Sequence, residues 1–157
     1  AFDMGTSYVL TMDADLSHSP QRIPELLAAM EERQADLAIG SRYVPGGATL
    51  AWGLHRKILS RTANWLAHTM LGLKARDCTS GFRCYRADFL RQIDLEGIRT
   101  DGYSVLMELL FLCVARGAKV VEIPIVFHNR KRGKSKISRA EIFKAVGTLM
   151  RLWRRHA

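Results

Sequence analysis

No stretch of this sequence is long and apolar enough to cross a bilayer. A membrane-spanning helix needs roughly 20 consecutive, mostly apolar residues. The longest apolar stretch, residues 105–115, is much shorter and contains Glu108. A composition of 48% hydrophobic and 25% charged residues over 157 residues is typical of one globular domain with a substantial core.

Cysteine is scarce as well. The three cysteines, Cys78, Cys84 and Cys113, are odd in number and show no C-x-x-C spacing. This pattern argues against a zinc site or a disulfide framework and favours a reducing compartment. We expect all three to be small buried hydrophobic residues.

The first 129 residues carry no surplus of charge, since 14 Lys and Arg balance 14 Asp and Glu. Residues 130–157 hold 10 Lys and Arg against Glu141 alone, so they account for the whole net charge of +9. A cationic tail favours a polyanionic partner, either a membrane surface, a lipid phosphate or nucleic acid. The chain has no nucleic-acid-binding motif. A non-catalytic basic module that binds nucleic acid or membrane is nevertheless kept as an alternative from another functional class.

Two carboxylates follow the first apolar run. Residues 8–12 are rich in β-branched and aromatic types, which predicts a buried strand, and Asp13 and Asp15 come directly after it. In extended backbone these two side chains point the same way and repel unless a cation lies between them. Carboxylate oxygens suit Mg²⁺ or Mn²⁺, which would bridge to substrate phosphates. The alternative is an Asp-rich turn that caps the next helix.

Hydrophobic periodicity predicts an α/β chain. We expect further strands at residues 35–39, after residue 83 and at 119–127, and helices ending near residue 33, at 54–71, 88–93 and 103–116, and after Ser138. Gly72 is expected to end the helix at 54–71, whose apolar side would hold Ile58, Leu59, Leu66 and Met70. Pro124 marks the last strand as an edge or bulged strand. Residues 43–51 are expected to form a loop.

Six segments occur in an order that is familiar. They are Asp13–His18 (DADLSH), Gly40–Gly47 (GSRYVPGG), Arg61–Asn64, Asp77–Arg83 (DCTSGFR), Glu122–Phe127 and Arg130–Lys136 (RKRGKSK). Over almost the whole chain the sequence closely resembles the dolichol-phosphate mannose synthases, also called polyprenol monophosphomannose synthases. These are inverting family 2 glycosyltransferases of the GT-A fold.

The resemblance implies a GT-A, Rossmann-like sheet with flanking helices. It also implies that the N-terminal βαβ portion, which carries much of the nucleotide-base pocket, is missing. The expected domains are residues 1–136, the C-terminal part of the catalytic domain, and residues 137–157, a basic amphipathic helix. We expect residues 1–157 alone to be inactive, because a parallel sheet without its first strands exposes an apolar edge.

The implied reaction moves mannose from GDP-mannose to a polyprenyl or dolichyl phosphate. By their match to the family motifs, Asp15 and Asp13 would bind Mg²⁺ or Mn²⁺, with Ser17 as a further ligand or a turn cap. Arg42, Arg56 and Arg130 would surround the phosphates. The remaining implied substrate contacts are Asp77, Thr79, Ser80, Ser135 and Lys136, and Asp15, Arg42 and Arg130 are the residues to which we assign catalysis.

The final helix combines an apolar stripe with basic residues and can lie at an anionic membrane surface. We expect Ile142 and Phe143 to pack on the enzyme, and Met150, Trp153 and the terminal arginines to face the membrane. The enzyme would then act at the cytoplasmic face of a membrane, with a separate membrane-anchoring subunit or domain as a partner. The main rival within the family is transfer of glucose from UDP-glucose to a polyprenyl phosphate.

Overall fold

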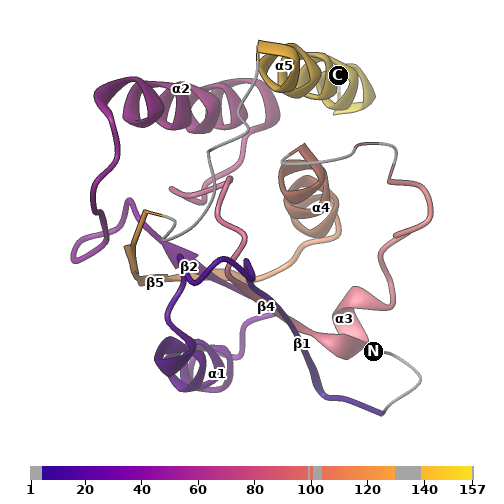
Figure 1. Cartoon of the computed structure of the whole chain (residues 1–157). Coiled ribbons are helices and arrows are strands. Elements are labelled where there is room, and N and C mark those ends of the chain that lie inside the picture. The colour runs from indigo at the N-terminus through magenta and orange to yellow at the C-terminus, as the bar shows by residue number, and fades with distance from the viewer. Residues whose placement is uncertain (1–4, 99, 101–103, 130–138, 157) are drawn as a thin grey trace.

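The computed structural model describes residues 5–98, 100, 104–129 and 139–156, with the backbone alone for 139–145 and 155–156. A four-stranded sheet forms its centre (Figure 1). Its strands are β1 (Tyr8–Thr11), β2 (Leu37–Ser41), β4 (Arg83–Arg86) and β5 (Val120–Pro124), in the order β1-β4-β2-β5. The sheet is mixed rather than wholly parallel, because β4 runs antiparallel to both β1 and β2.

The strand β2 pairs in parallel with β5, and a second small sheet extends this pairing. It consists of β3 (Ala48–Thr49) and β6 (Val126–Phe127). The chain therefore continues from β5 to β6 with a break at Ile125, next to Pro124, whose missing N–H cannot join a ladder. Pro124 ends an edge strand, as its sequence position predicted, and the expected loop at 43–51 contains β3.

Helices cover both faces of the sheet (Figure 1). The helix α1 (Ile23–Glu32), preceded by the 3₁₀ turn η2 (Pro20–Arg22), lies on one face. The helices α2 (Leu54–Leu71), α4 (Ser104–Ala115) and α5 (Arg139–His156) lie on the other, and α3 (Ala87–Leu90) follows β4 directly. The bounds of α2 agree with the sequence prediction, and Gly72 ends it with a left-handed φ of 64°.

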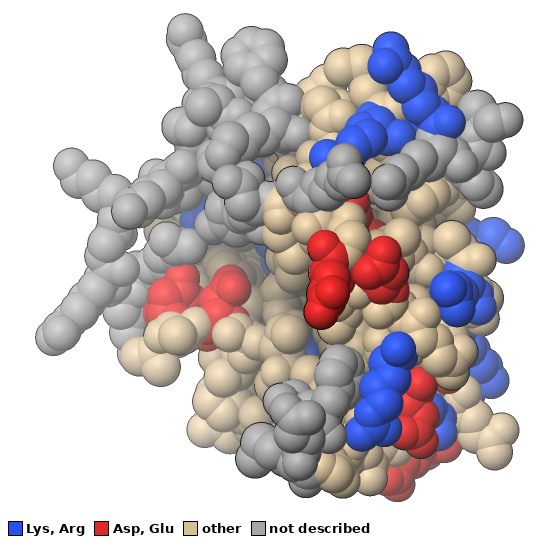
Figure 2. Space-filling view, turned by 90° about the vertical axis from the view of Figure 1, so that its right-hand side faces the viewer, with Lys and Arg blue, Asp and Glu red and all other residues tan. Residues whose placement is uncertain are grey.

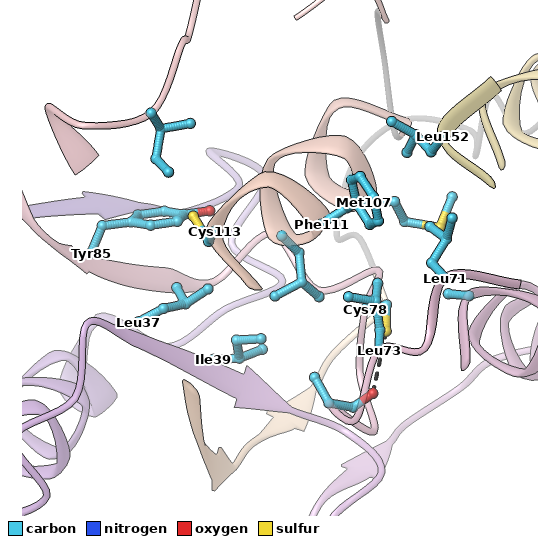
Figure 3. Close-up of a cluster of buried hydrophobic side chains, with 14 of the residues drawn as sticks. Leu37, Ile39, Leu71, Leu73, Cys78, Tyr85, Met107, Phe111, Cys113 and Leu152 are labelled. Atoms are coloured by element: carbon cyan, nitrogen blue, oxygen red, sulfur yellow. Dashed lines mark hydrogen bonds between the residues drawn. The ribbon is translucent and has the colours of Figure 1, made fainter. Parts of the chain in front are cut away.

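The alternating pattern of β2 divides the core in two. Leu37 and Ile39 point toward α2, α4 and α5, whereas Ala38 packs on the side of α1 beside Leu26 and Met30. Figure 3 shows the larger cluster, in which side chains from β2, β4, α2, α4 and α5 interdigitate. All three cysteines are buried, and burial raises the pKa of the Cys78 thiol to about 12, as expected for inert hydrophobic cysteines.

The last helix belongs to this core. Leu149 and Leu152 of α5 are 1% and 0% exposed within the larger cluster, and Figure 3 shows Leu152 pointing toward α4. Arg151 Nη2 lies 3.3 Å from the buried carboxylate of Glu108 on α4. Next to these buried residues, Met150 and Trp153 of α5 are about half exposed. The helix thus packs on the body through one side, and Arg151 is held by that body rather than directed at a membrane as the sequence suggested.

The helix α2 differs from its prediction in one respect. Leu66 and Met70 pack against the core as expected, but Ile58 is 57% exposed. It lies on a second, outward-facing stripe together with Leu54 and Trp65.

Both signs of charge occur on the face shown in Figure 2, with acidic side chains at its middle and left and basic ones along its right and at the top, near α5. This agrees with the even charge balance of residues 1–129. Within the described part of the chain, no helix is long and apolar enough to span a membrane.

Candidate active site

The D-x-D pair lies in the turn that follows β1. The strand ends at Thr11, so both carboxylates lie beyond it and Asp15 is in a turn, where Asp15 Oδ1 accepts a hydrogen bond from the Ser17 amide at 3.0 Å. Between them and the next strand, Leu16 adopts a left-handed φ of 62°. A non-glycine residue in this region marks local strain, which here is held by the Asp15–Ser17 hydrogen bond.

A glycine lets the turn after residue 80 approach Asp13. A Cβ atom on Gly81 would lie 2.9 Å from Asp13 Oδ1, closer than carbon and oxygen can approach without movement. Thr11 Oγ1 donates to the Gly81 carbonyl at 2.9 Å and fixes this contact. The C-terminal end of β1 and the turn before β4 therefore form one wall of the site.

The two carboxylates suit a divalent cation that takes only a few of its ligands from the protein. The side chain of Asp13 is 41% exposed, and the Ser17 hydroxyl is buried with no hydrogen-bond partner among the described residues. Over the same residues no group of three or more His, Cys, Asp or Glu could hold a metal. Two carboxylates fit Mg²⁺ or Mn²⁺, which keep several waters and bind substrate phosphates, and do not fit a closed zinc site.

His18 is a buried aromatic contact of the site. Its ring stacks on Phe82 with centroids 5.3 Å apart and meets the edge of Phe127 at 5.0 Å. Burial lowers the pKa of His18 below its ordinary value and outweighs the opposing attraction of Asp13. His18 is therefore neutral at physiological pH, and it also lines a cavity of about 140 Å³.

Arg42 and Asp77 form a buried, bidentate ion pair. Arg42 Nε and Nη2 lie 2.7 and 2.6 Å from the two carboxylate oxygens, and the Arg42 amide donates to the same group at 3.0 Å. Burial favours the neutral acid, but these hydrogen bonds and the Arg42 charge hold the pKa of Asp77 below its ordinary value. Burial also acts against the charge of Arg42, yet Asp77 raises the pKa of that guanidinium.

Thr79 and Ser80 take part in the same turn with different partners. Arg42 Nη2 donates to Thr79 Oγ1 at 2.7 Å, so Thr79 lies directly beside the guanidinium. Ser80, 1% exposed, instead donates its hydroxyl to the Gly40 carbonyl at 2.6 Å. The structure therefore brings Arg42, Asp77 and Thr79 together and places Ser80 in a contact that supports β2.

Three residues that sequence reasoning did not assign to the site anchor this turn. Asn64 of α2 accepts from the Cys78 amide at 2.7 Å, and the Glu122 carboxylate of β5 accepts from the Asp77 amide at 3.0 Å. Arg83, fully buried, donates to the carbonyls of Cys78 and Ser80. Asn64 and Glu122 lie inside recognised segments, but nothing in their spacing shows that they bind backbone atoms.

A tryptophan joins the two described arginines of the site. The guanidinium carbons of Arg56 and Arg42 lie 4.0 and 5.1 Å from the ring centroid of Trp52, which also meets Phe127 edge-on at 5.3 Å. Because Phe127 contacts His18 as well, a continuous series of rings links the D-x-D turn to the two cations. The predicted residues Arg130, Ser135 and Lys136 lie outside the described residues.

The chain is similar to known proteins over most of its length. The family model described as glycosyl transferase family 2 matches residues 4–94. The chain is 42% identical to an undecaprenyl-phosphate mannosyltransferase of Micrococcus luteus over 149 residues, which cover 95% of this chain and 60% of that protein. It is 43% identical to a polyprenol monophosphomannose synthase of Mycolicibacterium smegmatis over 142 residues, 90% of this chain and 53% of that protein. The chain thus spans little more than half the length of these relatives.

Proposed function

The chain belongs to glycosyl transferase family 2, and from this membership we propose that the protein transfers mannose from GDP-mannose to a polyprenyl or dolichyl phosphate. The observation that most strongly supports this proposal is the sequence identity of 42% and 43%, over nine-tenths of the chain, to two proteins whose names both describe polyprenyl-phosphate mannose synthesis. The mixed α/β sheet with flanking helices is consistent with the GT-A fold.

The proposed transfer inverts the anomeric centre. An oxygen of the polyprenyl phosphate attacks the anomeric carbon, and the bond from that carbon to the diphosphate breaks, with its electron pair leaving on GDP. The acceptor phosphate is already ionised near neutral pH, so the reaction needs no strong general base. What it needs is positive charge that brings two anionic substrates together and stabilises the leaving group.

The site offers both kinds of group. Asp13 and Asp15, with the Ser17 hydroxyl, would hold Mg²⁺ or Mn²⁺, which when bound stabilises charge on the departing diphosphate. Arg56 stacks on Trp52 and hydrogen-bonds the neutral amide oxygen of Asn129 at 3.3 Å. Arg42 is held by Asp77 through two of its nitrogens, and we assign contact with a substrate phosphate to Arg56, with Arg42 supporting it. Arg130, Ser135 and Lys136 are proposed to complete the cationic side.

The activity is tested on the protein expressed at full length from its gene. Labelled GDP-mannose and UDP-glucose are offered separately with a polyprenyl phosphate in detergent, and label in the lipid extract is counted. We expect label from GDP-mannose alone and its loss on treatment with EDTA. Label from UDP-glucose alone would replace the mannose proposal with the glucose alternative.

We predict that Asp15→Asn removes most of this activity, by about 100-fold or more in kcat, because a metal-binding carboxylate becomes a neutral amide. Asp88→Asn is the matched control, since Asp88 is an 84% exposed aspartate on α3. Undiminished turnover of the Asp15 variant at saturating Mn²⁺ would contradict the metal assignment.

The proposed partner on the lipid side is an anionic membrane surface, at the cytoplasmic face and with a separate anchoring subunit or domain. Two neighbouring helices leave apolar side chains exposed: Leu54, Ile58 and Trp65 on α2, and Met150 and Trp153 on α5. Figure 1 shows α2 and α5 side by side at the same edge of the molecule. We call these five residues the apolar strip.

The charges near the apolar strip complement anionic lipid. The helix α2 contains Lys57 and Arg61 and no acidic residue, and Arg154 of α5 is exposed. Basic residues beside exposed aromatic and aliphatic side chains are typical of helices that lie in a membrane interface.

A further inference from the structure

We propose that Trp52 is a positioning residue whose indole ring holds the Arg56 guanidinium in place for a phosphate group of the substrate. This inference rests on the proposed function, because it assigns the binding of phosphate within that same site. The ligand chemistry is a phosphate oxyanion, from either the nucleoside diphosphate or the polyprenyl phosphate.

The first argument is the geometry of the ring. Trp52 is 9% exposed, and its centroid lies 4.0 Å from Arg56 Cζ, so the guanidinium is in direct contact with the ring face. A cation over an indole is attracted by the negative face of the ring, and the attraction grows when water is excluded. Phe127 supports the ring from its edge, at 5.3 Å between centroids.

The second argument is the backbone that presents Trp52. Ala51 adopts a left-handed φ of 57°, which L-residues rarely do. Its carbonyl accepts a hydrogen bond from Asn129 Nδ2 at 3.2 Å, and the other end of the same amide, Oδ1, accepts from Arg56 Nη1. One side chain therefore fixes both the strained residue before the tryptophan and the guanidinium stacked on it.

The third argument is the position of Arg56 in its helix. The helix α2 is capped by Gly53, so Arg56 is the third residue of its first turn, and this turn contains no acidic residue. The partial positive charge of a helix N-terminus disfavours a cation there and favours an anion. The unfavourable placement is understandable if an anion binds between the helix start and Arg56. Within the described structure the buried Trp52 Nε1 has no hydrogen-bond partner, so the tryptophan itself retains an unused donor.

The test uses the full-length protein and the variants Trp52→Ala, Trp52→Phe and Arg56→Gln, with Arg33→Gln, an exposed arginine next to the end of α1, as control. We expect Trp52→Ala to lower kcat/KM by about tenfold, mainly through KM. Trp52→Phe keeps a ring face and should restore most of the loss. A rise in KM for GDP-mannose would identify the donor diphosphate as the ligand, and a rise for the polyprenyl phosphate would identify the acceptor.

The double variant separates positioning from a general structural role. If Trp52 acts through Arg56, Trp52→Ala should cause little further loss in the Arg56→Gln background. Losses that multiply, or unchanged KM values for both substrates in Trp52→Ala, would overturn the proposal. Binding of Mg-GDP and of a short isoprenyl phosphate, measured calorimetrically, does not depend on turnover, so it decides the role of Trp52 even if no sugar transfer is found.

Discussion

At the scale of single residues, the Arg42–Asp77 pair is the feature of the site whose burial costs the most free energy if either partner is removed. Both side chains are removed from water, at 6% and 0% exposure. A buried ion pair is weak evidence for net stability, but removing one partner leaves a buried charge without compensation. Neither residue can therefore be replaced alone without a cost in stability. The Thr79 hydroxyl contacts both side chains of the pair.

We predict that Asp77→Asn lowers the free energy of unfolding by about 3–5 kcal/mol at pH 7. The pKa of Asp77 is depressed in the folded protein, so its contribution is complete above the unfolded pKa of about 3.9 and is lost as pH falls through the folded pKa. The unfolding free energies of wild type and variant should therefore converge in acid. Urea denaturation across pH measures both curves.

Asp88→Asn removes a carboxylate from an exposed pair with Arg91 and is the control for this comparison. It should change stability by no more than about 1 kcal/mol. A loss in Asp77→Asn that is just as small, or that does not shrink in acid, would show that Asp77 is not ionised in the folded protein.

The order of the motifs was sufficient to identify Asp13, Asp15 and Arg42 as candidate site residues, because they lie in short segments with a specific pattern. It could not show that Trp52 and Phe127 touch, since they are far apart in sequence and meet only because β3 pairs with β6. The packing of the His18 ring between Phe82 and Phe127 was likewise not predicted from the sequence. Contacts of this kind arise from tertiary structure and leave no local signal.

At the scale of elements, α2 combines three roles along one helix. Its start carries Arg56, its middle supplies Asn64 to the turn that holds Asp77, and its outer side exposes the α2 part of the apolar strip. At 100° per residue, Leu54, Ile58 and Trp65 lie within about 40° of one another around the helix axis. Three large apolar side chains on one narrow stripe indicate a surface that is covered in the working protein.

We predict that changing Leu54, Ile58 and Trp65 together to Gln weakens binding to anionic liposomes by at least about tenfold, because apolar surface no longer enters the interface. Binding of the wild type should fall as salt rises, since basic residues contribute. Sedimentation with liposomes measures this. Turnover of a short, water-soluble acceptor should change little, and an equal loss there would show that the stripe belongs to the catalytic body.

Element boundaries were predictable where a local signal existed. Gly72 ended α2 as expected because a glycine adopts left-handed φ freely, and Pro124 ended β5. The second strand was predicted at residues 35–39 and is found at Leu37–Ser41, because its limits follow from pairing with β4 and β5. The antiparallel direction of β4 was not predicted, since pairing direction is a property of the whole sheet.

At the scale of the whole molecule, α5 closes the larger core. We predict that Leu152→Ala lowers the free energy of unfolding by about 2–5 kcal/mol, because a fully buried side chain leaves a cavity between α5 and its neighbours. Met150→Ala, on the exposed side of the same helix, should cost much less. Urea denaturation of the two variants compares them directly, and equal losses would mean that α5 does not pack as the structure shows.

The position of α5 in the chain has a consequence for how the protein is made. A ribosome releases β1, α1 and β2 long before residues 149–152, yet the cluster that contains Leu37 and Ile39 is completed by Leu149 and Leu152. During synthesis the α1 side of the sheet can bury its apolar residues early, while the opposite side stays open. The nascent chain is thus exposed to aggregation and benefits from chaperone protection until α5 emerges.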